Sequence, residues 1–302
     1  MPKTFPFAPK NCTLCPRQCH ADRASGRVGF CGAGGTLKAA RAALHFWEEP
    51  PISGTRGSGA IFFSGCPLRC VFCQNESISQ KHFGTPLTPE RIRSLCLDLI
   101  AQGAHNINLV SPTHYAHILS EVLAEPLPVP VVWNTGGYEK VETLAALAGK
   151  VDIYLPDLKY LDGTVAARYS AAPDYPAVAT AAIREMVRQV GPVQLDENGI
   201  LQKGVIIRHL ILPGQLPGAR AVMDWVAETF QPGEVLFSLM SQYIPCGQAG
   251  RYPELNRPLR RAEARKGAEY MALLGLEGFT QEQSAASQTY IPDFDLTGLT
   301  TE

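Results

Sequence analysis

The sequence has almost no excess charge of either sign. Its 302 residues include 27 Lys and Arg against 28 Asp and Glu, so the formal net charge is −1. A strongly basic surface for nucleic acid or for an anionic membrane is therefore not expected. We expect instead a partner that is a small molecule or a protein.

Long hydrophobic runs are also missing. No stretch reaches the about eighteen consecutive apolar residues of a membrane helix, and the opening residues, MPKTFPFAPKNC, lack the apolar core of a signal peptide. Internal repeats and low-complexity tracts are absent too. These absences predict a cytoplasmic protein, and 45% hydrophobic residues are enough to bury one substantial core.

Cysteine, in contrast, is plentiful. The chain has nine cysteines, and clustered thiols in a reducing compartment usually bind metal or take part in catalysis. Seven of them lie within the first 73 residues, in two groups: Cys12, Cys15, Cys19 and Cys31, then Cys66, Cys70 and Cys73. Metal chemistry is therefore the main signal of the sequence.

Short apolar runs alternate with segments of helical periodicity from about residue 58 onward. Strands are predicted at residues 59–64, 106–110, 129–134, 151–156, 204–212 and 235–240. Helices are predicted at residues 88–102, 114–124, 138–148, 174–190, 217–230 and 259–274. Six strand–helix units favour a parallel sheet but are too few for a closed eight-stranded barrel. The predicted fold class is α/β, an open partial (β/α)6 barrel.

Three regions are expected along the chain. Residues 1–52 form a Cys-rich segment with little periodicity, which predicts a small, loop-rich unit held by a bound metal. Residues 53–280 carry the strand–helix pattern of the barrel. The polar residues 281–302 are expected to be a C-terminal tail packed on the barrel.

The first barrel strand leads directly into Cys66-Pro-Leu-Arg-Cys70-Val-Phe-Cys73, which has CxxxCxxC spacing. Three thiolates can hold three corners of a [4Fe-4S] cluster and leave the fourth iron open to another ligand. Structural zinc is the alternative, but three cysteines leave a zinc site one ligand short. The spacing thus favours a cluster with an open iron.

This motif resembles the hallmark of the radical S-adenosylmethionine (SAM) superfamily, CxxxCxΦC, in which the aromatic residue Φ is here Phe72. The resemblance implies that the open iron binds the amino and carboxylate groups of SAM, with Phe72 against the adenine. It also implies that the reduced cluster cleaves SAM to a 5′-deoxyadenosyl radical. A one-electron donor such as flavodoxin or ferredoxin would be needed.

Polar residues follow the later strands, at the carboxyl ends where catalytic and binding residues lie in such folds. Ser111, Thr113 and His114 follow the second strand, where many radical SAM proteins have a Gly-Gly-Glu-like segment that this chain lacks. They are candidates for contact with SAM or substrate. For Thr113 and His114, capping of the next helix is an equally good interpretation.

A charged pair, Asp157 and Lys159, ends the fourth strand and can point into the barrel from one face. It resembles an element of glycyl-radical-enzyme activating enzymes such as pyruvate formate-lyase activating enzyme, which implies that Asp157 binds a monovalent cation and Lys159 reaches SAM or substrate. Asn134 and Thr135 resemble the turn that completes this cation site, with Asn in place of Asp. Arg208 resembles a strand arginine directed at SAM. A structural Asp–Lys pair at the barrel mouth is the alternative.

The first four cysteines, with the spacing Cys12-x2-Cys15-x3-Cys19-x11-Cys31, supply four soft ligands. That set can saturate a tetrahedral zinc ion or an auxiliary Fe–S cluster, and we slightly favour a structural metal site. Alternatively, the thiols only pack, or only some of them bind metal.

Five segments, at residues 11–19, 29–33, 111–115, 152–160 and 238–243, resemble one branch of the superfamily, the homologues of pyruvate formate-lyase activating enzyme. The resemblance implies hydrogen abstraction from a protein or peptide substrate, which generates a glycyl radical or modifies a residue. One alternative is modification of a small metabolite or an RNA base, although the net charge near zero disfavours RNA. Another is a non-catalytic Fe–S or zinc protein.

Overall fold

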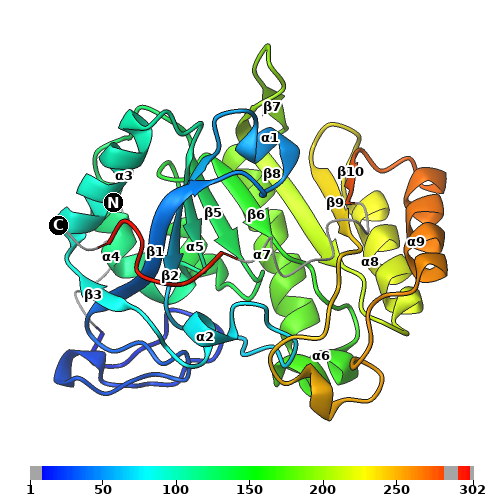
Figure 1. The fold of residues 1–302 in the computed structure, drawn as a ribbon, viewed down its shortest axis with the longest axis horizontal. Helices are drawn as coiled ribbons and strands as arrows, with labels where there is room; N and C mark the ends of the chain where they lie inside the picture. Colours follow the sequence, from blue (N-terminus) through cyan, green and yellow to red (C-terminus); the bar gives the residue numbers. More distant parts are fainter. Residues whose placement is uncertain (1–8, 282–291, 300–302) are drawn as a thin grey trace.

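Six parallel strands form the centre of the fold in a computed structural model, which describes residues 9–281 and 292–299 (Figure 1). Each pairs with the next one along the chain, in the order β2 (Ser58–Phe63), β4 (Ile107–Val110), β5 (Val131–Thr135), β6 (Ile153–Pro156), β8 (Leu201–Leu210) and β9 (Leu236–Met240). Their carboxyl ends therefore meet at one edge of the sheet. All six predicted strands are confirmed, with ends displaced by at most three residues.

Four further strands extend the sheet. β1 (Leu37–His45) pairs antiparallel with β2, and β3 (Thr85–Leu87) pairs antiparallel with β1. β10 (Gly278–Thr280) adds parallel to β9, and the short β7 (Gln194–Leu195) pairs with β8. Within the described chain, β3 and β10 stand at the two ends of the strand order and do not pair with each other. The predicted open, partial barrel is thus confirmed.

Helices cover the outer side of the curved sheet. In Figure 1, α3 and α4 lie near β1 and β2, while α8 and α9 lie near β9 and β10. Six helices overlap the six predicted ones: α3 (Pro89–Ala101), α4 (Ala116–Val122), α5 (Val141–Ala145), α7 (Tyr175–Val190), α8 (Leu216–Thr229) and α9 (Arg261–Leu273). The other described helices are α1 (Pro50–Ser53), α2 (Glu76–Ser79), α6 (Gly163–Ser170), η1 (Arg23–Ser25), η2 (Thr113–Tyr115) and η3 (Ala249–Arg251). None of the described helices is long and apolar enough to cross a membrane.

The longest helix, α7, shows why these segments fold as they do. Its buried residues include Ala179, Ile183, Met186 and Val190, which recur at helical spacing and face the sheet. The helix ends at Gly191, whose φ of 71° reverses the chain at little steric cost. Burial of one apolar stripe thus fixes α7 against the core.

The interior of the barrel is closed at the amino ends of the strands by α1. Ile52 is fully buried there, in an apolar cluster with Val132, Ile153 and Leu236 near the starts of β5, β6 and β9. Asn106, just before β4, donates a hydrogen bond to the Ile52 carbonyl oxygen at 2.7 Å. The segment that leads into α1 consequently crosses the inside of the barrel.

The N-terminal region is less loop-rich than expected. The prediction is wrong for Leu37–His45, which forms β1. This Ala-rich stretch has few strong strand formers, and pairing with β2 decides its conformation. Of the expected tail, residues 282–291 and 300–302 lie outside the described residues. Residues 292–299 lie along β1, where Leu296 N donates to the Ala40 carbonyl oxygen at 3.1 Å.

Candidate functional site

A cavity of about 560 Å³ lies inside the barrel and opens toward the carboxyl ends of the strands. Its wall joins the loop after β2 to the ends of β4, β5, β6 and β8. The wall includes ten of the residues that the sequence analysis singled out: Cys66, Cys70, Phe72, Cys73, Ser111, Asn134, Thr135, Asp157, Lys159 and Arg208. The predicted convergence of these side chains on one site is therefore seen in the structure.

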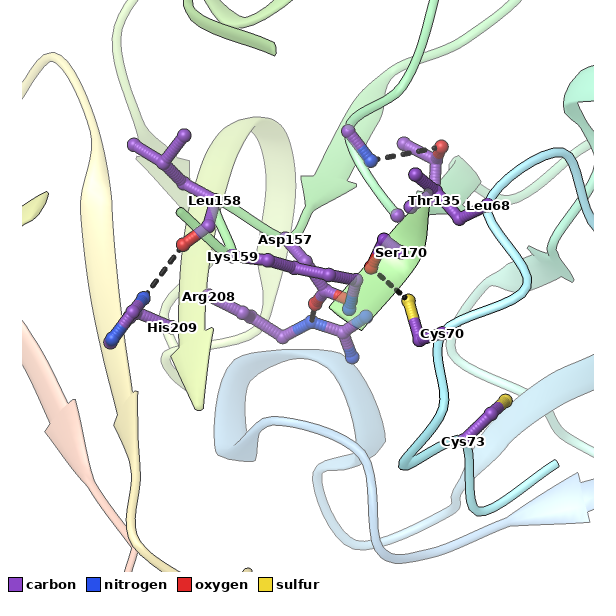
Figure 2. A network of polar contacts seen from close by, with 12 residues as sticks. Leu68, Cys70, Cys73, Thr135, Asp157, Leu158, Lys159, Ser170, Arg208 and His209 are labelled. Carbon is purple, nitrogen blue, oxygen red and sulfur yellow. Dashed lines mark hydrogen bonds and ion pairs between the residues drawn. The ribbon is translucent and has the colours of Figure 1, made fainter. Parts of the chain in front are cut away.

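The three cysteines of the loop after β2 each have a hydrogen-bond partner for sulfur. Cys66 Sγ accepts from its loop neighbour Leu68 N at 3.4 Å. Cys70 Sγ accepts from Ser170 Oγ, at the end of α6, at 3.0 Å (Figure 2). Cys73 Sγ lies 3.3 Å from Ser79 Oγ. Such contacts stabilise sulfur that carries negative charge or binds metal.

These thiols fit a metal cluster by their chemistry. Burial raises the pKa of Cys66, Cys70 and Cys73, while the nearby Lys159 ammonium lowers the pKa of Cys66 and Cys70. No three His, Cys, Asp or Glu side chains in residues 9–281 and 292–299 are already drawn together as a metal site. A metal that binds these thiols would displace their protons.

Arg17 anchors the cysteine loop from the N-terminal region. Its Nε donates to the Pro67 carbonyl oxygen at 2.8 Å, and its Nη2 donates to the Ser170 carbonyl oxygen at 2.9 Å. Cys66 N also donates to the Cys31 carbonyl oxygen at 3.2 Å. The sequence analysis missed this role, although Arg17 lies between two of the cysteines that it had singled out.

A second group of charges lies on the cavity wall, around Arg208. Its Nε donates to Asp157 Oδ1 at 3.0 Å, and its Nη2 donates to Asn134 Oδ1 at 2.7 Å. Figure 2 shows Asp157, Lys159 and Arg208 extending toward one another, whereas His209 points to the opposite side of β8. The alternation of strand side chains thus turns Arg208 inward.

Asp157 is the shared partner of both cations in this group. Burial alone would raise the pKa of Asp157, but Arg208 and Lys159 together hold it below its usual value. Burial alone would likewise lower the pKa of Lys159, and Asp157 raises it. All three side chains are therefore charged, and buried charges of this kind need such pairing.

Glu48 completes the group and was missed by the sequence analysis. It follows β1, and its Oε1 accepts from Arg208 Nη1 at 2.8 Å. Its Oε2 accepts from Asn108 Nδ2 and from Asn134 Nδ2, both at 2.9 Å. The one available signal was the acidic pair Glu48-Glu49 in front of two prolines, inside the region expected to be loops.

The cysteine loop and the charged strand ends lie within a stretch of sequence that matches a known family. The sequence profile described as the radical SAM superfamily matches residues 60–215, which span β2 to the loop after β8. The chain belongs to the radical SAM superfamily. Membership implies a [4Fe-4S] cluster and SAM as cofactors, and the donor set on the cavity wall fits both.

Among curated proteins, the chain is 31% identical over 271 residues to the uncharacterized protein MJ0674 of Methanocaldococcus jannaschii. The match covers 86% of this chain and 74% of that relative. The similarity therefore extends well beyond the radical SAM region itself.

Among solved structures, the fold resembles SuiB of Streptococcus suis bound to S-adenosylmethionine, with a TM-score of 0.50 and 17% identity. The match covers 72% of this chain and 48% of SuiB. SuiB bound to the precursor peptide SuiA gives the same TM-score with 16% identity, over 72% of this chain and 46% of SuiB. The chain thus spans about half the length of SuiB, and at this identity the likeness concerns the fold alone.

Two of the predicted residues of the radical SAM site are turned away from its cavity. Of the described residues, Thr113 and His114 are not on the cavity wall. His114 is 1% exposed, its Nε2 lies 2.8 Å from the Ser64 carbonyl oxygen, and burial lowers its pKa to about 3. Neither side chain caps η2 or α4, so the capping interpretation is wrong.

Thr113 instead contacts a buried carboxyl group behind the cavity. The hydroxyls of Thr113 and Thr135 both donate to Glu139 Oε1, and Trp133 Nε1 donates to the same oxygen at 3.3 Å. Burial raises the pKa of Glu139 to about 7, against the opposing effect of these donors. Glu139 therefore ties the end of β4 to the end of β5.

The four N-terminal cysteines of this radical SAM protein lie close together. Cys15 is within electrostatic range of Cys12, Cys19 and Cys31, and burial raises its pKa to about 12. The sulfurs of Cys19 and Cys31 flank Gly29, at 3.1 and 3.6 Å from the position that a Cβ atom would take there. These four soft donors fit a tetrahedral metal or a cluster.

Proposed function

We propose that this radical SAM enzyme abstracts a hydrogen atom from a protein or peptide substrate, as the glycyl-radical activating enzymes do. The observation that carries the proposal is the single cavity wall shared by the cysteine loop and the charged strand ends. When bound, a reduced [4Fe-4S] cluster supplies the electron that cleaves SAM to a 5′-deoxyadenosyl radical. A flavodoxin or ferredoxin is the expected source of that electron.

In this proposal the loop residues hold the cofactors. Cys66, Cys70 and Cys73 ligate three irons, and the hydrogen bonds to their sulfurs fix the orientation of the thiolates. Phe72, on the wall beside them, packs on the adenine. The 7% exposure of Phe72 supports this role, because the ring has little freedom to move away.

The charged group orients SAM and excludes water. Lys159 and Arg208 present positive charge to the carboxylate of SAM, and Asp157 holds both of them in place. Asn134, Thr135 and Ser111 add polar atoms along the wall. Because each charge is already paired, little reorganisation is needed when SAM binds.

A peptide is favoured as substrate over a small metabolite by the open barrel. The sheet is not closed within the described chain, which leaves a lateral route for an extended segment. SuiB, which shares this fold, has been seen with its precursor peptide. The balanced charge of the chain fits a protein partner better than RNA.

The test is anaerobic reconstitution followed by metal analysis and an assay of 5′-deoxyadenosine release with dithionite. We expect about four irons at Cys66, Cys70 and Cys73, and loss of release in the variant in which all three are changed to Ala. Cys246→Ser, outside both cysteine groups, should keep both properties and serves as the control. A fully loaded wild-type protein that neither binds SAM nor releases 5′-deoxyadenosine would overturn the proposal.

A further inference from the structure

The inner end of the cavity is built by the segment that crosses the barrel between β1 and α1. This segment carries two adjacent acids on the cavity wall, Glu48 and Glu49. Glu48 is fully engaged by Arg208 and two asparagines. Glu49 is only 1% exposed and faces the β9 side, where Ser238 and Gln242 lie.

The polar atoms around Glu49 are short of partners. Glu49 Oε1 has one long contact, 3.4 Å from Gln281 Nε2, and Glu49 Oε2 has none among the described residues. The Ser238 hydroxyl is near enough to lower the pKa of Glu49, but its Oγ completes no hydrogen bond. Gln242 Oε1, also on this wall, is buried without a partner. Buried acceptors are rarely left unpaired in proteins.

Glu49 also lacks a cation of its own. Arg208 pairs with Asp157 and Glu48, and Lys159 pairs with Asp157. Across the described residues, no Lys or Arg forms an ion pair with Glu49. Burial raises the pKa of Glu49 to about 7, although the more distant Arg208 opposes the shift and Glu48 adds to it.

A partner that donates hydrogen bonds and carries positive charge would satisfy these acceptors and stabilise Glu49 as a carboxylate. An ammonium or guanidinium group has only donors, which are what Glu49 Oε2 and Gln242 Oε1 both lack. The same wall holds apolar side chains, including Phe62, Leu210 and Met240. An apolar stem that ends in a cationic head, as in lysine or arginine, matches this lining.

We infer that Glu49 and Gln242 form a subsite that binds a cationic nitrogen group, an ammonium or a guanidinium, of the substrate. The inference rests on the proposed function, because it places the substrate in the cavity beside SAM. Glu49 is a binding residue in this scheme and takes no part in SAM cleavage. Lys or Arg in a peptide, or a free amine, could supply the group.

The experiment uses the reconstituted, SAM-loaded enzyme and isothermal titration calorimetry. The probe is n-butylammonium, and n-butanol is the neutral control of equal length. Glu49→Gln should weaken butylammonium binding by about ten- to a hundredfold, since hydrogen bonds to charged groups are worth that much. Gln242→Leu should weaken it as well, and the exposed Glu197→Gln should leave it unchanged.

Several outcomes would overturn the inference: no binding of butylammonium to wild type, equal binding to Glu49→Gln, or equal binding of butanol. A fall in SAM affinity in Glu49→Gln would also overturn it, by assigning the carboxyl group to SAM. Because glutamine has the shape of glutamate and removes an unpaired charge, this variant is expected to fold.

The source of the cation is identified by a second titration with the tripeptide acetyl-Gly-Lys-Gly-amide. Tighter binding than that of butylammonium supports a peptide substrate, and equal binding supports a free amine. The proposed function is tested separately, by 5′-deoxyadenosine release without substrate in wild type and in the exposed Glu197→Gln, which should be the same. Loss of that release in both proteins would count against the function and not against the subsite.

Discussion

The guanidinium of Arg208 brings together acceptors from three parts of the chain. Asn134, Asp157 and Glu48 all accept from it, at distances from 2.7 to 3.0 Å. A monovalent cation was predicted beside Asp157 and Asn134 by resemblance to activating enzymes. In this chain a fixed cation already lies between these ligands.

From this arrangement we expect 5′-deoxyadenosine release to be independent of Na⁺ and K⁺. Release should change by less than about twofold when tetramethylammonium salts replace sodium and potassium salts at equal ionic strength. The measurement is the rate of 5′-deoxyadenosine formation in each buffer. A large loss of rate that either ion restores would show that a metal cation joins this group.

Glu48 is expected to be the most sensitive residue of the charged group. Glu48→Ala removes one partner of a buried ion pair and leaves the amides of Asn108 and Asn134 without an acceptor. We expect the free energy of unfolding to fall by about 3 kcal/mol and SAM affinity to fall with it. Denaturant unfolding and SAM titration measure the two effects, with Glu197→Ala as control. Unchanged stability would contradict the contacts seen.

Glu139 makes the stability of the fold depend on pH. Its pKa is raised by burial from 4.5 to about 7, so the protonated form is favoured in the folded state. Its contribution to stability is therefore present below about pH 4.5 and is lost as the pH rises through 7. The loss amounts to about 3 kcal/mol. Between pH 5.5 and 8, the melting temperature of Glu139→Gln should change less with pH than that of wild type. Parallel profiles of melting temperature for the two proteins would contradict this expectation.

At the scale of elements, the cysteine loop depends on its neighbours for its shape. Gly65 begins it with a φ of 96°, where a side chain would collide with the Cys31 carbonyl oxygen at 2.6 Å. Arg17 then holds the loop and the end of α6 together. The guanidinium of Arg17 also lies 4.2 Å from the centre of the Phe30 ring.

Removing this anchor should loosen the cluster without removing a ligand. We expect Arg17→Ala to retain less iron and to lose it to a chelator about tenfold faster, because two buried carbonyl oxygens lose their donor. Arg17→Lys should restore little, since an ammonium cannot reproduce the forked contacts. Iron content and the rate of loss of cluster absorbance are the readouts. Arg27→Ala, at an exposed position, is the control and should behave as wild type.

At the scale of the whole molecule, the N-terminal region and the barrel form one structure. β1 lies in the same sheet as the barrel strands, and Cys31 contacts the loop of Cys66. The fully buried Arg23 donates to the His114 carbonyl oxygen at 2.6 Å. The four N-terminal cysteines are thus joined directly to the site.

Loss of the N-terminal metal should therefore affect the whole chain. Changing Cys12, Cys15, Cys19 and Cys31 to Ser is expected to remove one zinc or one auxiliary cluster and to lower the melting temperature by about 10 °C. Metal analysis and a thermal scan under anaerobic conditions give both quantities. Equal metal content and equal melting temperature in the variant would mean that these thiols only pack.

Much of the site could be predicted because its signals are local. The spacing of Cys66, Cys70 and Cys73 fixes a three-thiolate donor set whatever the rest of the chain does. The alternation of apolar runs and helical segments predicts parallel strands, and parallel strands bring their carboxyl ends together. Asn134, Asp157 and Arg208 therefore had to lie near the cysteine loop.

The sequence could not determine which distant segments of the chain come together, or where the backbone turns a side chain away from the cavity. Glu48 reaches Arg208 across 160 residues, because β1 pairs with β2 and sends the following segment through the barrel. Ser111, in a left-handed conformation with a φ of 58°, turns the chain so that Thr113 and His114 leave the cavity. Spacing thus determined which groups could bind the cluster and SAM, and only the tertiary packing decided which other side chains surround them.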